Sequence, residues 1–147
     1  MEVAKLIKDY LAEAKIMQLA TTDDNQPWAC SVHIAADSDL NLYWLSNSFR
    51  RHSIEIEKNP KVAATIPIKF PENPVIGISV EGHAQTTDST EAIELYDKKF
   101  GLTPGFKQKL LEGNADEKVY VLRPRLWVLF DLVNFPDKPR QEWRPKG

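Results

Sequence analysis

Residues 40–60 read LNLYWLSNSFRRHSIEIEKNP and pass from a strand pattern to a helix pattern within a few residues. The first part, Leu40 to Asn47, is rich in the apolar and aromatic residues that are typical of a strand. Ser48 is then predicted to cap a short helix that runs to Lys58. Asn59-Pro60 ends this helix, because the residue before a proline is driven out of the helical region. The stretch therefore predicts a strand, a short helix and a return to strand.

Upstream of this stretch, the pattern indicates one helix and two more strands. Apolar residues at helical spacing between Glu2 and Ala14 predict an amphipathic helix. Ile16 to Thr22 and Trp28 to Ala35 then have strand character and are joined by a run of turn-forming residues. With the strand from Leu40 to Asn47, they predict an antiparallel meander of three strands connected by hairpins.

Downstream, strand and helix patterns alternate and lead into a tail that contains several prolines. The predicted elements are strands over Val62 to Ile68 and Ile76 to Thr87, helices over Glu91 to Phe100 and Thr103 to Glu112, and an apolar run from Lys118 to Val133 that forms one bent strand or two. Ser89 or Thr90 is expected to cap the first of these helices. The tail from Pro136 to Gly147 has no predicted element and stays loose unless something holds it.

Six antiparallel strands are thus expected in one small domain. Such a set favours a closed barrel over an open sheet, because closure removes the exposed strand edges. The length of 147 residues is enough for one continuous core and too short for two ordinary ones. We therefore expect a single domain over residues 1–147.

The composition argues against several classes of function. The net charge is -2, so no overall basic field favours nucleic acid. The one cysteine, Cys30, allows no internal disulfide and no multi-cysteine metal cluster, which fits a reducing cytoplasm. The amino terminus lacks the unbroken apolar stretch of a signal peptide or a membrane span. We expect a cytoplasmic protein without a membrane partner.

Two histidines and the cysteine lie within strand patterns, where structural roles are expected. His33 and His83 have no third histidine and no cysteine pair at ligand spacing, so no metal site is predicted. Cys30 has no basic neighbour in the sequence and is expected to be a small buried hydrophobic residue.

The residues that are best suited to bind a ligand lie where the strand meets the helix, namely Ser46, Arg50, Arg51 and His52. The first turn of a helix has unpaired backbone N–H groups and a partial positive charge, and arginine adds a planar fork that matches phosphate oxygens. The junction therefore predicts an anion-binding site. In the alternative interpretation, the two arginines form a solvated basic face that pairs with Glu55.

The order of the motifs resembles the FMN-binding split barrels that are similar to pyridoxamine 5'-phosphate oxidase. Gln26-Pro27 precedes the second strand, Ser46 ends the third, and the pairs Arg50-Arg51 and Asn59-Pro60 bracket the short helix. The likeness continues through Val62-Ala63-Ala64, the glycine-centred strand Val80-Glu81-Gly82-His83-Ala84 and the closing strand Leu126 to Leu132. It covers nearly the whole chain, and the pair Arg51-His52 is most similar to a small branch of the family.

This resemblance implies a mainly β fold with helices (α+β), a six-stranded antiparallel split β-barrel that binds FMN at the interface of a homodimer. The phosphate would lie on Ser46, Arg50, Arg51 and His52, and the ring would be flanked by Ser31, Val32 and His33. The implied function is that of an FMN-dependent oxidoreductase acting on a small organic substrate. Two alternatives stay open, namely a flavin-binding protein without turnover and a split barrel that binds haem or a deazaflavin.

The carboxy terminus departs from the oxidase pattern. The spacing of Phe135, Arg140, Trp143 and Arg144 does not match the Trp and Arg residues with which the oxidases bind their pyridoxal-type substrate. Position 77, where the oxidases commonly have an amide side chain, is Gly77. The resemblance therefore gives no support for vitamin B6 oxidation.

Overall fold

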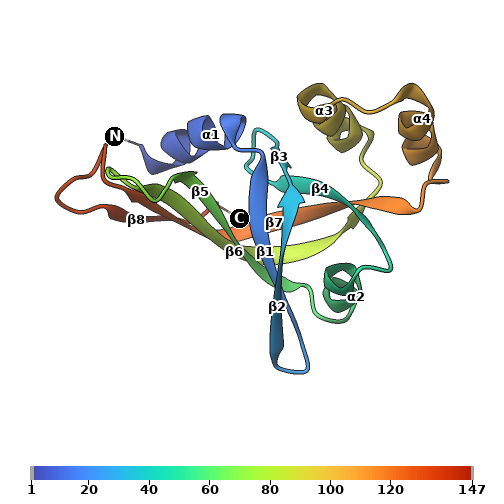
Figure 1. Cartoon of the computed structure of the whole chain (residues 1–147), viewed down its shortest axis with the longest axis horizontal. Helices are drawn as coiled ribbons and strands as arrows, with labels where there is room; N and C mark the ends of the chain where they lie inside the picture. The colour runs from blue at the N-terminus through green and yellow to red at the C-terminus, as the bar shows by residue number, and fades with distance from the viewer. Residues whose placement is uncertain (1, 147) are drawn as a thin grey trace.

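The computed structural model describes residues 2–146, which form helices and strands around a curled antiparallel sheet (Figure 1). In chain order the elements are α1 (Val3–Glu13), β1 (Ile16–Asp23), β2 (Gln26–His33), β3 (Ala35–Ala36), β4 (Leu42–Asn47), α2 (Arg51–Lys58), β5 (Lys61–Lys69), β6 (Ile76–Thr87), α3 (Thr90–Phe100), α4 (Pro104–Glu112), β7 (Glu117–Asp131) and β8 (Arg140–Trp143).

The strand pairings run in a ring. The order in the sheet is β2-β1-β5-β6-β7-β4-β3, and β8 pairs with β7 beside this path. Because β2 and β3 are one segment interrupted at Ile34, the same stretch of chain borders β1 at one end of the order and β4 at the other. The predicted six-stranded split β-barrel is thus confirmed, with β3 and β8 as additional short strands.

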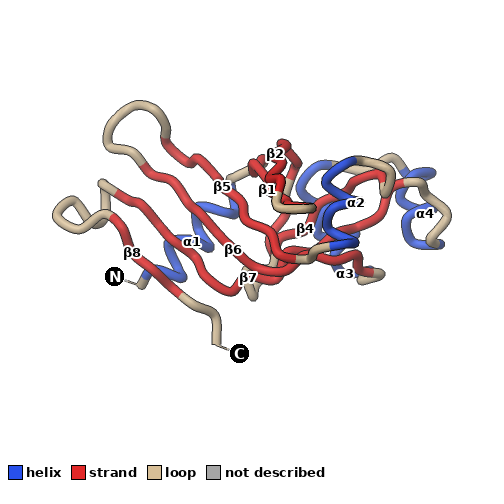
Figure 2. The backbone as a smooth tube through the Cα atoms, turned by 90° about the horizontal axis from the view of Figure 1, so that it is seen from below, coloured by secondary structure: helices blue, strands red, loops and turns tan. Residues whose placement is uncertain are grey.

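The predicted meander is confirmed, although its second pairing is very short. β1 and β2 pair along eight residues each, whereas β3 pairs with β4 only through Ala35 with Tyr43 and Ala36 with Leu42. On its other edge β4 pairs with β7 along its whole length, from Leu42 to Asn47. The curl of the sheet that makes this possible is visible from below (Figure 2).

The core lies inside the barrel and is formed by alternate residues of its strands. Trp44 of β4 and Trp127 of β7 are fully buried there, and Ile7 and Leu11 of α1 cover the same core. A second, smaller core lies on the other side of β4 and β7, where α3 and α4 pack on side chains such as Val121. β7 is therefore apolar on both faces over part of its length, which explains the long apolar run in the sequence.

β7 is one strand with a bulge, which agrees with the first of the two predicted forms, one bent strand rather than two. The register with β6 shifts between the pairs Glu81 with Leu126 and Gly82 with Pro124, so β7 has one extra residue there. Inward-facing positions therefore change from even numbers, such as Leu122, to odd numbers, such as Trp127.

Three local predictions can be compared with the structure. Ser89 caps α3 by accepting a hydrogen bond from the backbone N–H of Ala92, as predicted. The cap proposed for Ser48 is wrong, because α2 begins only at Arg51 and Ser48 lies in the turn before it. The tail is held by β8, whose Trp143 packs against the core, and no strand was predicted there because its four residues have no strand pattern of their own.

Among residues 2–146, no helix has both the length and the apolar character that crossing a membrane requires.

The close approach of β6 to β7 at the bulge predicts a stability difference between two glycines of β6. A Cβ atom on Gly82 would lie 2.1 Å from the carbonyl oxygen of Arg123. We expect Gly82→Ala to lower the free energy of unfolding by about 1–3 kcal/mol, because overpacking forces the backbone apart. Gly77→Ala is the matched control, since no atom lies within 4 Å of its added Cβ. Equal melting temperatures of the two variants by circular dichroism would contradict this account.

Candidate functional site

The junction between β4 and α2 lies beside β1 and β2, because α2 packs mainly on β1 (Figure 1). A tight turn connects the two elements. Its backbone is fixed by Asn47, whose side-chain oxygen accepts from the N–H of Phe49 at 2.8 Å and whose carbonyl accepts from the N–H of Arg50 at 3.1 Å. α2 then begins with backbone N–H groups that have no partner within the helix. This end of α2 is positively polarised and faces the end of β4.

Ser46, His52 and Ser53 form a buried polar cluster at this junction. The Oγ atom of Ser46 lies 2.7 Å from Nε2 of His52 and 3.4 Å from Oγ of Ser53, which donates to it. When Nε2 carries the imidazole proton, Ser46 Oγ accepts from both neighbours and its own proton is left for a ligand. The structure therefore brings together two of the four residues predicted to hold a phosphate.

Burial lowers the pKa of the His52 imidazole below its ordinary value, and the charge of the nearby Arg50 lowers it further. The imidazole is therefore neutral at neutral pH. The guanidinium of Arg50 itself is exposed to solvent. The cluster thus consists of neutral hydrogen-bonding groups, and the positive charge of Arg50 lies near it.

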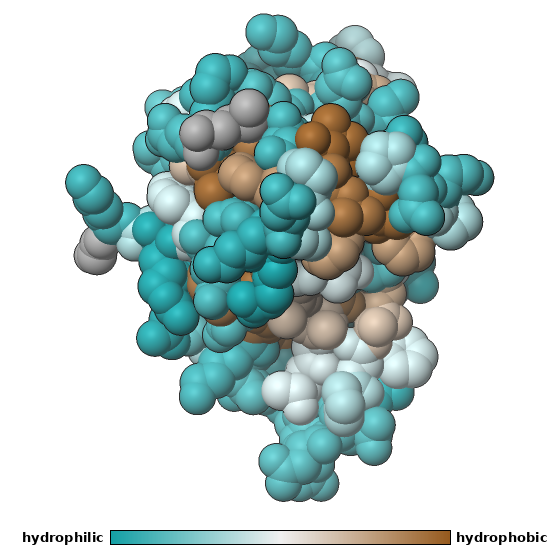
Figure 3. Space-filling view, turned by 90° about the vertical axis from the view of Figure 1, so that its left-hand side faces the viewer, coloured by the Kyte–Doolittle hydropathy of each residue, from teal (hydrophilic) through white to brown (hydrophobic). Residues whose placement is uncertain are grey.

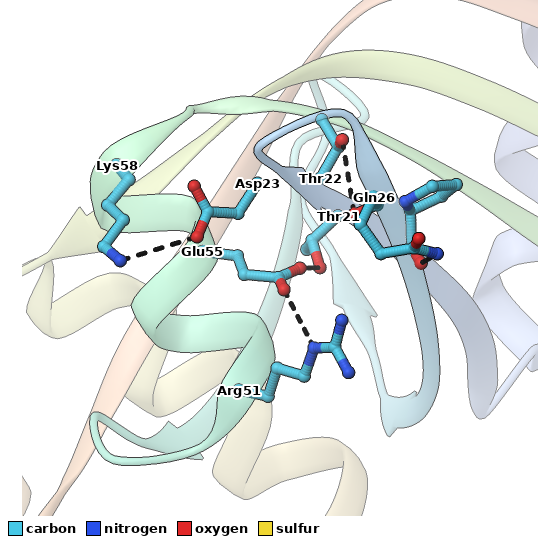
Figure 4. Close-up of polar contacts among 8 residues, drawn as sticks. Thr21, Thr22, Asp23, Gln26, Arg51, Glu55 and Lys58 are labelled. Carbon is cyan, nitrogen blue, oxygen red and sulfur yellow. Dashed lines mark hydrogen bonds and ion pairs between the residues drawn. The ribbon is translucent and has the colours of Figure 1, made fainter.

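Arg51 is held by two neighbours at the side of α2. Its Nε donates to Oε2 of Glu55 at 2.9 Å (Figure 4). Its guanidinium carbon lies 4.1 Å from the ring centre of Trp28 on β2. Glu55 is buried and also accepts a hydrogen bond of 2.7 Å from Oγ1 of Thr21 on β1. The pairing of Arg51 with Glu55 that the alternative interpretation expected is therefore present. The phosphate role of Arg50 and Arg51 stays a prediction.

The three residues predicted to flank a flavin ring lie on β2 and face both ways. Ser31 and His33 point to the outer face of the barrel, where Ser31 Oγ accepts from Nε2 of Gln18 at 3.4 Å and the ring of His33 meets that of Phe100 edge-on at 5.2 Å. The side chain of Val32 packs against the core instead. Only the backbone of Val32 is thus available to a ligand on the outer face.

The outer face next to Ser31 contains a shallow groove of about 480 Å³, within the range of small-molecule sites. Its floor is formed by small residues, because the register sets Ala20 of β1 between Ala29 of β2 and Ala63 of β5. Glu81 is the one charged residue among those that line it. The sequence did not indicate this groove, since the three alanines come together only through the pairing of their strands.

A second groove of about 420 Å³ continues from the first, with which it shares Thr65, Ser79 and Val128. It ends at the loop between β5 and β6, where the side chains of Phe70 and Phe130 are exposed. At this end of the molecule, apolar surface is visible among hydrophilic residues (Figure 3). Across the two grooves, Glu81 is the one charged residue among those that form the lining.

Sequence reasoning identified part of this site and missed the rest. Glu55 was indicated by its spacing of four residues from Arg51. Thr21 and Trp28 were not, because they lie on other strands and meet α2 only in the folded barrel. Over residues 2–146, no group of three or more His, Cys, Asp or Glu side chains is placed to hold a metal ion.

The sequence matches one family model and one relative at lower coverage. The family model described as pyridoxamine 5'-phosphate oxidase matches residues 3–129. A UPF0306 protein of Pasteurella multocida is 29% identical over 91 residues, which are 60% of this chain and 60% of that protein. The match to this curated relative thus spans less than two thirds of its length.

Two solved structures have the same fold. General stress protein 26 of Bacillus anthracis has a TM-score of 0.71 at 17% identity, covering 98% of this chain and 99% of that one. The haem storage protein HutZ of Vibrio cholerae has a TM-score of 0.65 at 21% identity, covering 85% and 92% of the two chains. At these identities the likeness concerns the fold alone.

The burial of His52 predicts a pH-dependent stability. Because its pKa is lower in the folded protein than the ordinary value of 6.5, the unfolded chain binds this proton more readily. The contribution of His52 to the free energy of unfolding is therefore complete above the ordinary pKa, and it is lost as the pH falls toward the pKa of the folded state. In urea titrations between about pH 7 and pH 5, His52→Gln should lose less stability than the wild type.

His83→Gln serves as the control for removing an imidazole, since His83 is exposed on β6. It should keep the pH dependence of the wild type. If the free energy of unfolding of His52→Gln falls with pH as steeply as that of the wild type, the burial of a neutral imidazole at position 52 is contradicted.

Proposed function

Because this chain belongs to the pyridoxamine 5'-phosphate oxidase family, we propose that it binds FMN at the junction of β4 and α2. We further propose that it is an oxidoreductase that acts on a small organic substrate. The observation that carries this proposal is the contact of the Ser46 hydroxyl with His52 in the first turn of α2, the helix that Arg50 precedes and Arg51 begins.

The groups at the junction fit the phosphate of FMN. Backbone N–H groups at the start of α2 and the hydroxyl of Ser46 are donors for phosphate oxygens. Arg50 and Arg51 add positive charge, and the guanidinium of Arg51 has further N–H donors besides the Nε that Glu55 occupies. The neutral His52 holds Ser46 in place from the buried side.

The flavin ring needs a surface that continues from this anchor. Ser31, His33 and the backbone of Val32 lie on β2, the strand that also carries Trp28 beside Arg51. When bound, the flavin supplies the hydride or electron chemistry, so the chain itself needs no acid–base motif. The residues of this chain would then bind the cofactor, orient it and shape the space for a substrate.

We also propose that the protein is a homodimer whose interface is the outer face of the barrel. Two adjoining grooves on this face are lined almost entirely by small and apolar residues around Ala63, which supports a surface that a partner covers. A two-fold contact on this face would cover both grooves and complete the surroundings of the ring.

Haem is a second candidate ligand, and a non-catalytic flavin carrier is a second candidate role. HutZ, a haem storage protein by name, has this fold. The chain has exposed imidazoles at His33 and His83, and histidine is a common axial ligand of haem iron. Bleaching of a bound flavin by reduced nicotinamide would support an enzyme over a carrier.

Titration of the apo protein with FMN, riboflavin and haemin tests the ligand. A phosphate anchored by several charge-assisted hydrogen bonds should make FMN bind about a hundredfold more tightly than riboflavin, equivalent to roughly 3 kcal/mol. High salt should reduce this preference, because the arginines are partly exposed and their charge is screened. Equal affinities for FMN and riboflavin would refute the phosphate anchor. Binding of haemin alone would refute the flavin.

Arg51→Ala should weaken FMN binding about tenfold to a hundredfold while leaving riboflavin binding unchanged, as expected for one lost charged hydrogen bond. Lys58→Ala removes the same charge from the other end of α2 and is the matched control. A wild-type affinity for FMN in Arg51→Ala would place the phosphate elsewhere.

The dimer can be tested by light scattering at micromolar concentration. The wild type should have the mass of two chains, and Ala63→Arg should have the mass of one, because a charge would be buried in the contact. Glu57→Arg, an exposed change on α2, is the control and should remain dimeric. A monomeric wild type would refute the proposed interface.

A further inference from the structure

Glu55 divides its two carboxylate oxygens between the barrel and the candidate phosphate site. Oε1 accepts from the hydroxyl of Thr21 on β1 at 2.7 Å, and Oε2 accepts from Nε of Arg51 at 2.9 Å. The residue is 5% exposed, although it lies on a short surface helix. Burial of a carboxylate costs free energy unless the charge is paired and hydrogen-bonded, as it is here by Thr21 and Arg51.

The charge of Glu55 is secured by these contacts. The hydrogen bond from Thr21, followed by that from Arg51, holds the pKa of the carboxyl below its usual value. Lys58, on the same helix, pairs with Asp23 at 3.4 Å and so provides a separate link to β1. Arg51 is therefore the cation that Glu55 orients.

The contact leaves most of the Arg51 guanidinium free for a ligand. Nε is one of five N–H donors in a rigid planar fork, so the Nη groups remain available. In Figure 4 the dashed line from Arg51 starts at Nε and none reaches an Nη group, and the side chain is 47% exposed. Trp28 lies against the flat side of the guanidinium at 4.1 Å. One edge and one face of Arg51 are thus fixed, and the other edge is presented to the solvent.

We propose that Glu55, itself held by Thr21, is a positioning residue that fixes Arg51 for the phosphate of the flavin. Glu55 then determines how strongly the site prefers phosphorylated over unphosphorylated flavin. This inference rests on the proposed function. Its physical reason is preorganisation, because an arginine that is already oriented loses less conformational freedom when the phosphate binds.

If the contact of Glu55 with Thr21 and Arg51 were purely structural, the loss of Glu55 would change ligand affinities in a different way. A partly exposed ion pair contributes little to folding stability. If Glu55 only attached α2 to β1, its loss would disturb the whole junction and weaken every ligand alike. If it positions Arg51, its loss affects only ligands that have a phosphate, and only while Arg51 is present.

A double-mutant cycle separates these roles, with the affinities for FMN and riboflavin as the readout. Glu55→Gln keeps the shape of the side chain and should weaken FMN binding about tenfold, within the usual range of coupling energies. Riboflavin binding should not change. In the background of Arg51→Ala, the same substitution should have no further effect on FMN.

Substitutions of Thr21 provide a second route if Glu55→Gln folds poorly. Thr21→Val removes the hydroxyl and keeps the shape, so it should weaken FMN binding but not riboflavin binding. Thr21→Ser retains the hydroxyl and should bind FMN as the wild type does.

Three outcomes would overturn the inference. Equal losses of FMN and riboflavin affinity in Glu55→Gln would assign the residue a structural role. Additive effects of Glu55→Gln and Arg51→Ala would show that the two act independently. If Arg51→Ala alone leaves FMN binding unchanged, the phosphate anchor of the proposed function fails and the inference fails with it. The first two outcomes leave the proposed function intact.

Discussion

The barrel depends on residues 26–36, a single extended segment that pairs with β1 through its first eight residues and with β4 through its last two. This segment brings the two ends of the strand order together and so closes the ring of pairings. The end of β4, the start of α2 and the hairpin of β1 and β2 consequently lie side by side. The contacts that join α2 to the barrel follow from this closure, namely the stacking of Arg51 on Trp28 and the hydrogen bond from Thr21 to Glu55.

The site combines local and distant contributions. The turn after β4 and the start of α2 supply donors and charge from one continuous stretch, as in other helix-terminal anion sites. The barrel supplies rigidity, because β1 and β2 fix the side chains of Glu55 and Arg51 from outside the helix. Preorganised groups on a rigid scaffold are what a cofactor-binding protein has to provide, since the cofactor supplies the chemistry.

Much of the fold was predictable because it is encoded locally. Strand patterns and apolar runs between turn-forming residues identified the six long strands, and the start of α3 at Ser89 and the end of α2 at Asn59-Pro60 were indicated by residue type. The start of α2 was missed, because the capping preference of Ser48 is weaker than the turn imposed by Asn47. β8 was missed because its stability comes from β7 and not from its own residues. Within the site, the link from Thr21 to Glu55 joins residues 34 positions apart and could not be inferred from spacing.

A crystal structure of the protein with FMN would test the central claim most directly. The account predicts that the phosphate lies at the start of α2, within hydrogen-bonding distance of the Ser46 hydroxyl and of the Nη groups of Arg51. It also predicts that Nε of Arg51 donates to Oε2 of Glu55 in this complex. A phosphate bound away from this junction, or an Arg51 that leaves Glu55 to reach it, would contradict the account.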